Sequence, residues 1–105
     1  MTVVNTNVWK PSPGRMADFT AAVSVAKKIH ERLGARVAVW QTAIGGAADT
    51  VAYTTEFDDM TGFGTFADKL QTDEEWQAFW TAATSSTDAI ATLVNTVLVT
   101  EMEGL

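Results

Sequence analysis

Cysteine is absent from the 105-residue chain, and histidine and tyrosine occur once each. Without cysteine the chain offers no disulfide, no thiolate nucleophile and no thiolate metal ligand. A metal site would then depend almost entirely on carboxylates, and the paired acidic residues of this chain stand at predicted helix starts, where capping already gives them a role. We therefore expect no metal site and no cofactor.

Positive charge and long apolar runs are also scarce. Seven Lys and Arg residues stand against thirteen Asp and Glu residues, which gives a net charge of −6. Because nucleic-acid binding draws its affinity from clustered basic residues, we expect no nucleic-acid partner. No apolar run approaches the roughly 20 residues that cross a bilayer, and the first residues do not have the pattern of a signal peptide. A cytoplasmic protein without a membrane partner is the expectation.

The residues that are present predict one globular domain over 1–105, with 47% apolar and 19% charged residues. Strand-like composition marks four segments, at 2–9, 36–44, 51–57 and 94–102. We expect Pro11 and Pro13 to prevent the first strand from continuing. Ser12 is then the predicted N-cap of the following helix, with Pro13 at its first position.

From Pro13 onward, apolar residues from Met16 to Leu33 recur at helical spacing and predict the buried stripe of this helix, which Gly34 ends. The Gly-rich segment 45–49 is a predicted turn that joins the second and third strands into an antiparallel hairpin. Together with the first strand, these signals predict a strand, a helix and a β-hairpin in that order along the chain.

Two further helix starts carry acidic or hydroxyl caps. Asp58 or Asp59 is expected to cap a second helix. Thr72 and Glu75, three residues apart, form a predicted capping box for a third helical piece. A Thr- and Ser-rich break at 84–88 separates this piece from the last strand.

The predicted order is therefore β-α-β-β-α-β, an α+β ferredoxin-like domain. Right-handed crossovers place both helical layers on one face of a four-stranded antiparallel sheet with strand order 4-1-3-2. The helices can cover only that face.

Both faces of this sheet are nevertheless apolar. Val37 and Val39 alternate with Ala38 and Trp40, and in the last strand Leu98 alternates with its valine neighbours. At about 25 cal/mol per Å² of apolar surface, a whole exposed sheet face would forfeit many kcal/mol. We expect a homodimer that pairs sheet against sheet. The alternative is a monomer whose free face is Thr- and Ala-rich and tolerates water.

Three segments resemble a known family. They are Lys-Pro-Ser-Pro-Gly-Arg-Met-Ala-Asp-Phe at 10–19, Glu-Phe-Asp-Asp-Met at 56–60 and Asp-Glu-Glu-Trp-Gln-Ala-Phe at 73–79. Together they resemble the dimeric α/β-barrel superfamily over nearly the whole chain, with the NIPSNAP-like members closer than the antibiotic-biosynthesis-monooxygenase-like ones. The motifs are structural in kind: a cap, a turn and a core aromatic residue. They therefore indicate the fold and dimerisation more strongly than they indicate an activity.

The resemblance implies a wide range of activities. Relatives include cofactor-free oxygenases of aromatic polyketides, haem-degrading enzymes, lactone isomerases and proteins without a known activity. The haem-degrading relatives carry a ligating histidine on their later helix, whereas this chain has none between Asp58 and Thr92. That departure argues against haem.

Candidate site residues follow from the chemistry of cofactor-free oxygenation, which needs a dry pocket, a donor for the substrate oxygen and aromatic walls. Tyr53 and Asn7 are predicted to orient a substrate, and His30 is the one obvious base. The predicted aromatic walls are Trp40, Phe63, Trp76 and Trp80. Some oxygenase relatives use an Asn/Trp/Tyr set, but their spacing is not reproduced here, so no catalytic residue is carried over from them.

Each candidate also has a structural interpretation. His30 lies in the last turn of its helix, where the helix dipole favours an imidazolium, and the aromatic residues serve equally as core. The prediction is a homodimer that binds a small hydrophobic or aromatic ligand, as a cofactor-independent monooxygenase or isomerase. The alternative is a non-catalytic ligand-binding or protein-interaction module. A cavity with convergent polar groups favours a ligand site, whereas a solid core favours the interaction module.

Overall fold

The computed structural model describes residues 1–46 and 48–105, and they form a four-stranded sheet with three helices. The elements are β1 (Val3–Pro11), α1 (Met16–Arg32), β2 (Arg36–Gln41), β3 (Val51–Phe57), α2 (Met60–Thr72), α3 (Glu74–Thr84) and β4 (Ala91–Thr100). The strand order β2-β3-β1-β4 is the predicted order 4-1-3-2 counted from the other edge. The predicted ferredoxin-like α+β fold is confirmed. Ala47, in the predicted turn 45–49, lies outside the described residues.

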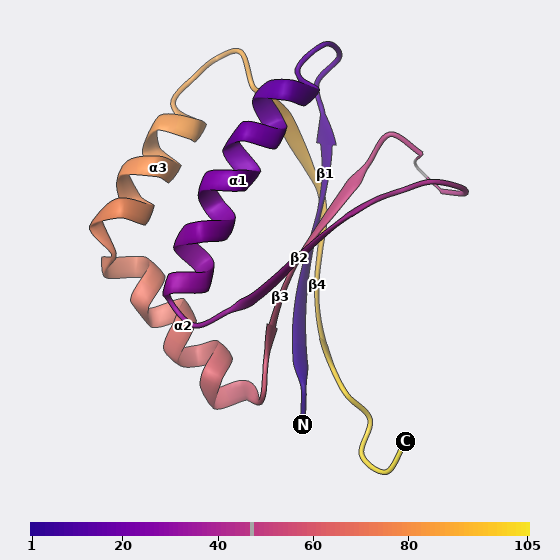
Figure 1. The fold of residues 1–105 in the computed structure, drawn as a ribbon, viewed down its shortest axis with the longest axis vertical. Helices are drawn as coiled ribbons and strands as arrows, with labels where there is room; N and C mark the ends of the chain where they lie inside the picture. The colour runs from indigo at the N-terminus through magenta and orange to yellow at the C-terminus, as the bar shows by residue number, and fades with distance from the viewer. Residues whose placement is uncertain (47) are drawn as a thin grey trace.

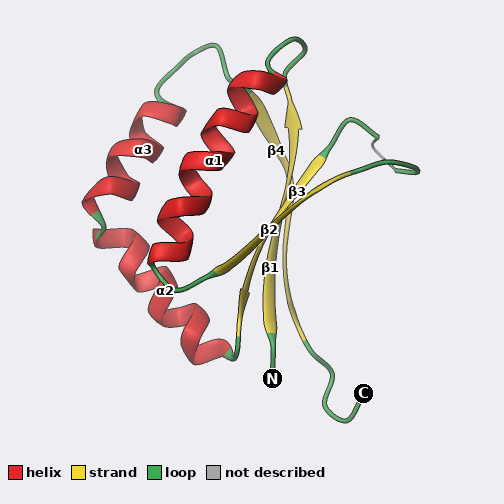
Figure 2. Ribbon diagram, viewed as in Figure 1, coloured by secondary structure: helices red, strands yellow, loops and turns green. Residues whose placement is uncertain are grey.

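All three helices lie on one side of the sheet, and the other side is bare (Figures 1 and 2). β1 is central and pairs antiparallel with β3 and β4, while β2 pairs antiparallel with β3. In β3 the alternate residues Val51, Tyr53, Thr55 and Phe57 are buried under the helices. The register therefore places alternate residues of each strand on the side of the sheet that faces the helices. The residues between them lie on the opposite side, which we call the free side. None of the helices in the described part of the chain is long and apolar enough to cross a membrane.

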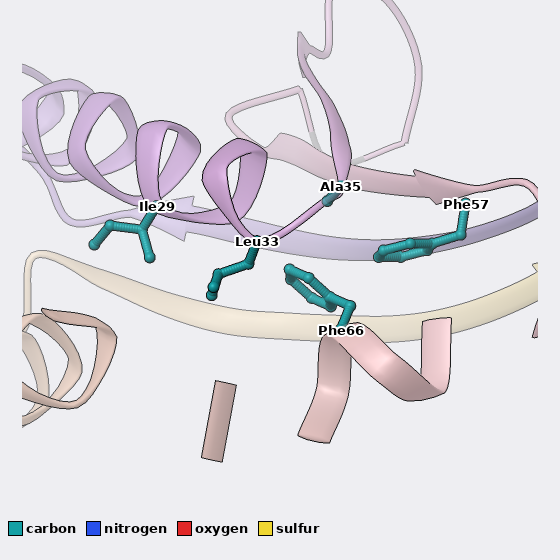
Figure 3. Close-up of a cluster of buried hydrophobic side chains, with 5 residues drawn as sticks. All are labelled: Ile29, Leu33, Ala35, Phe57 and Phe66. Atoms are coloured by element: carbon teal, nitrogen blue, oxygen red, sulfur yellow. The ribbon is translucent and has the colours of Figure 1, made fainter. Parts of the chain in front are cut away.

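The core lies between α1, α2 and β3. Its buried cluster consists of Ile29, Leu33, Ala35, Phe57 and Phe66 (Figure 3). The rings of Phe57 and Phe66 have centroids 5.0 Å apart. Full burial of one such large apolar side chain contributes about 1.5–3 kcal/mol, so this cluster makes a large apolar contribution to stability. β4 lies outside it, and all but the first of its residues are exposed.

The C-terminal end of α1 is closed by a Schellman motif. Gly34 has a φ of 106°, and its N–H donates to the carbonyl of Glu31, while the N–H of Ala35 donates to that of His30. This pair of bonds satisfies carbonyls that the helix end leaves without partners. The motif confirms the predicted stop at Gly34 and directs the chain into β2.

The predicted start of α1 is wrong. β1 continues through Pro11, which pairs only with Ala91 of β4 because the β3 ladder already ends at Trp9. A proline without an N–H is tolerated there. Ser12 does not cap the helix, since its hydroxyl donates to the carbonyl of Ala89. α1 begins instead at Met16, after an Arg15 that makes no side-chain cap.

The other helix starts and strand ends also differ in part. Asp59 caps α2 by accepting from the N–H of Gly62, as predicted. α3 is capped by Asp73 rather than by the predicted Thr72, because the Asp73 carboxylate accepts from the N–H of Trp76 and also binds Arg32. β2 ends at Gln41, three residues earlier than predicted, and β4 occupies Ala91–Thr100 rather than 94–102.

Candidate functional site

His30 of α1 and Tyr53 of β3 meet inside the protein. The His30 Nδ1 and the Tyr53 hydroxyl oxygen are 2.6 Å apart, and the two residues are only 8% and 5% exposed. The helix-facing register of β3 directs Tyr53 inward, and the last turn of α1 lies above it. Two of the residues predicted to be catalytic are therefore brought into direct contact.

The direction of this hydrogen bond follows from the number of groups left without partners. His30 Nε2 is buried and finds no partner among the described residues. A neutral imidazole has one donor and one acceptor nitrogen. If Tyr53 donates to Nδ1, only the Nε2–H lacks a partner. If Nδ1 donated, both Nε2 and the tyrosine hydroxyl hydrogen would lack one. The phenol is thus the donor.

Burial determines the charge of both groups. It lowers the pKa of His30 to about 4, so the imidazole is neutral at physiological pH. The expectation of an imidazolium favoured by the helix dipole is wrong, because the ring faces the core. Burial also raises the pKa of Tyr53, with a smaller contribution from the negative charge of Glu31. The pair is uncharged.

Aromatic rings surround the histidine. The His30 ring centroid lies 4.5 Å from that of Trp76 and 5.4 Å from that of Phe66. Trp80 stacks on Trp76, with centroids 5.5 Å apart and ring planes 19° from parallel. Two of the predicted aromatic walls, Trp76 and Trp80, therefore lie near the pair.

The hydrogen bonds at the start of α3 fix the position of Trp76. Asp73 caps α3, and its two carboxylate oxygens accept from Arg32 at 3.0 and 2.8 Å. Arg32 also donates to Glu75 at 2.9 Å. The bonds from Arg32 and from the N–H of Trp76 lower the pKa of Asp73. This network joins the end of α1 to the start of α3.

Asn7 completes the predicted catalytic set from the neighbouring strand. It is the register partner of Tyr53 in β3 and of Thr96 in β4, so all three share the helix-facing side. The Thr96 hydroxyl donates to Asn7 Oδ1 at 2.9 Å. Asn7 therefore lies beside Tyr53, at the boundary between the covered and uncovered parts of the sheet.

The helix-facing side of β1 and β4 remains partly uncovered, and we call this surface the open strip. By register it consists of Asn5, Asn7, Trp9, Leu93, Thr96 and Leu98. Leu93 and Leu98 are 48% and 42% exposed. Its centre is the polar Asn7–Thr96 pair, with Trp9 and Leu93 on one flank and Asn5 and Leu98 on the other. The predicted site residues include none from β4, although strand order and alternation place its residues beside Asn5 and Asn7.

Two predicted wall residues lie elsewhere. Trp40 is the register partner of Ala52, on the free side of the sheet, and is 62% exposed. Phe63 packs against Phe57 in the core, with centroids 5.5 Å apart. Neither residue shares a surface with the His30–Tyr53 pair.

Two hollows on the described surface lie away from this pair. One, of about 400 Å³, lies between the end of α1 and the start of α2, and another, of about 250 Å³, lies between α1 and the β2 edge. Neither is lined by His30 or Tyr53. Within residues 1–46 and 48–105, no group of three or more His, Cys, Asp or Glu residues is placed to hold a metal ion.

Comparison with known proteins identifies the family of this chain. A family model described as NIPSNAP matches residues 6–101, which confirms the resemblance seen in the sequence. Among curated proteins, no sequence matches the chain.

Solved structures share the fold at low identity. A NIPSNAP family protein from Agrobacterium tumefaciens str. C58 is 17% identical, with a TM-score of 0.77 over 99% of this chain and 96% of its own. An uncharacterised NIPSNAP domain protein from Burkholderia xenovorans is 18% identical, with a TM-score of 0.73 over 98% and 97%. A protein provisionally described as an antibiotic biosynthesis monooxygenase, from Chloroflexus aurantiacus J-10-fl, is 13% identical, with a TM-score of 0.59 over 100% and 97%.

Proposed function

The chain belongs to the NIPSNAP family, and on that premise we propose that it works as a homodimer that binds a small hydrophobic or aromatic molecule on the open strip. The observation that carries the proposal is the composition of this strip. It combines exposed leucines with the Asn7–Thr96 pair and lies beside the uncharged Tyr53 and His30.

The free side of the sheet supports the homodimer. On this side Trp40, Val97 and Val99 are 62%, 43% and 49% exposed, and the uncharged Thr6–Thr54 pair lies beside Val97. Its charged residues lie toward the ends, where Arg36 binds Glu56 across the strands at 2.7 Å and Lys10 is exposed. An uncharged centre with a charged rim is the usual arrangement of a protein interface. A second copy of the chain would present the same exposed tryptophan and valines, and pairing would bury both sets.

The open strip supports a ligand of low charge. Four of the described basic side chains form ion pairs: Lys10 with Asp49, Arg15 with Asp18 and Asp88, Arg32 with Asp73 and Glu75, and Arg36 with Glu56 and Asp58. The groups beside the strip are an amide, hydroxyls and a neutral imidazole. Such groups orient a ligand through hydrogen bonds while leucine and tryptophan provide apolar contact.

A catalytic form of the proposal is the second candidate, as a cofactor-independent monooxygenase or isomerase. Tyr53 and Asn7 would orient the substrate, and His30 would be the base. The observation in its favour is the Tyr53–His30 bond, because a neutral imidazole can accept a proton from the phenol. The closed surroundings of His30 favour simple binding over catalysis, since a base must come within hydrogen-bond reach of the proton it takes.

Two adjacent residues of β4 separate the two surfaces. Leu98 faces the open strip and Val97 the free side. We expect Leu98→Lys to lose binding of Nile red, an uncharged apolar dye, while it remains a dimer. We expect Val97→Lys to become monomeric. Dye fluorescence and light-scattering mass are measured on both variants, with circular dichroism to confirm folding.

Unchanged dye binding in a folded Leu98→Lys variant would contradict the ligand site. A Val97→Lys variant that stays dimeric would contradict the interface, whatever the dye does. The two halves of the proposal can therefore fail separately.

A further inference from the structure

A row of aromatic side chains joins the buried tyrosine to the surface. Successive ring centroids are 5.5 Å apart from Tyr53 to His30, 4.5 Å from His30 to Trp76 and 5.5 Å from Trp76 to Trp80. Exposure rises along the row, from 5% at Tyr53 to 41% at Trp80. Every ring in the row is in contact range of the next. The row therefore connects solvent to the core without a gap.

We propose that this row conducts a one-electron oxidation from Trp80 to Tyr53, with His30 as the proton acceptor. A one-electron oxidant in solution removes an electron from Trp80, and Trp76 passes an electron outward to refill it. Tyr53 then reduces the Trp76 radical cation. The Tyr53 O–H bond breaks as its electron leaves, and the proton moves to His30 Nδ1. The products are a neutral phenoxyl radical, an imidazolium and one equivalent of reduced oxidant.

The geometry of the pair suits this coupled step. The proton has only a 2.6 Å hydrogen bond to cross, and it moves from a donor phenol to an acceptor nitrogen. Burial opposes both a phenolate and an imidazolium, so the proton does not move to His30 before Tyr53 is oxidised. His30 Nε2 has no partner among the described residues to which a proton could be passed. The transferred proton therefore stays on His30 and returns to the phenoxyl oxygen when an electron is supplied.

The row is needed because the oxidant cannot reach the tyrosine. Tyr53 and His30 are both buried, and Phe66 and Trp76 enclose the histidine ring. The chain carries a net charge of −6, and α3 begins with Glu74 and Glu75, so a cationic oxidant is attracted to this surface. The activity that we assign to the aromatic row is the reduction of one-electron oxidants at the surface by the buried Tyr53. It requires no ligand on the open strip.

The composition of the chain makes the test unambiguous. Tyr53 is the only tyrosine, and two of the four tryptophans, Trp9 and Trp40, lie outside the row. The oxidant is photogenerated ruthenium(III) tris-bipyridine, and the radical is identified by electron paramagnetic resonance and transient absorption. We expect a tyrosyl radical in the wild type and none in Tyr53→Phe.

Variants of the two tryptophans in the row test the route. Trp76→Phe/Trp80→Phe should lose most of the tyrosyl yield. The single variant Trp80→Phe, at the exposed end, gives the same test with least disturbance of the core. His30→Gln should form the radical more slowly and lose the deuterium isotope effect of the proton transfer. No tyrosyl radical in the wild type, or an equal yield without Trp76 and Trp80, would overturn the proposal.

Discussion

The single histidine and the single tyrosine of the chain meet in the core, and burial keeps both uncharged. A histidine with a lowered pKa links stability to pH. The unfolded chain takes up a proton near the ordinary pKa of about 6.5, whereas the folded protein does so only near 4. Between these values the unfolded state binds more protons, so stability falls as the pH falls.

This linkage predicts a measurable loss in mild acid. With the folded pKa near 4, the His30 contribution to the free energy of unfolding should fall by about 2 kcal/mol between pH 7 and pH 5. Urea unfolding at several pH values in this window measures it. Because His30 is the only histidine, His30→Gln is the matched control and should show a much shallower slope. Parallel slopes in the two proteins would show that the folded histidine titrates normally.

Part of this site could be predicted from residues. Strand order and alternation place Asn7 beside Tyr53, because β1 and β3 are neighbours and the two residues share a face. The contact of His30 with Tyr53 depends on the rotation of α1 about its axis and on the exact end of that helix. Apolar spacing gives the buried stripe of a helix but not which polar residue at its margin turns inward. Trp40 illustrates the opposite difficulty, since a tryptophan in a two-sided apolar strand can belong to either face.

At the scale of elements, helix ends are fixed by particular hydrogen bonds. Gly34 ends α1 where the sequence indicates, because a residue with φ of 106° is best served by glycine. Asp73 displaces Thr72 as the cap of α3, since its carboxylate also binds Arg32 from a distant helix. Ser12 fails as a cap for a similar reason, because it is hydrogen-bonded to the segment before β4. Long-range partners of this kind leave no local signal in the sequence.

Two glycines give a matched test at this scale. An added Cβ meets no atom within 4 Å at either Gly34 or Gly64, so only the backbone distinguishes them. Gly34→Ala should destabilise the protein by about 1–2 kcal/mol, the cost of a left-handed conformation for alanine. Gly64→Ala, inside α2, should instead stabilise it by about 0.5–1 kcal/mol. Thermal or urea unfolding measures both, and equal effects would show that the φ of Gly34 does not control the end of α1.

At the scale of the whole molecule, the helices cover one side of the sheet and leave the other bare (Figure 1). Even the covered side is incomplete, because Leu93 and Leu98 of β4 remain exposed. The sequence predicts the two-sided apolar pattern, and the structure assigns each residue to a side. The homodimer and the ligand both remain proposals, and they concern opposite sides of one sheet.

The most direct test of the dimer is the light-scattering mass of the protein in solution across a dilution series. We predict a mass twice that of the 11.3 kDa chain, maintained on dilution, because the apolar free side is buried against a second copy. Val97→Lys should give the mass of a single chain under the same conditions. A wild-type mass of one chain at every concentration would contradict the account, since the free side would then remain exposed to water.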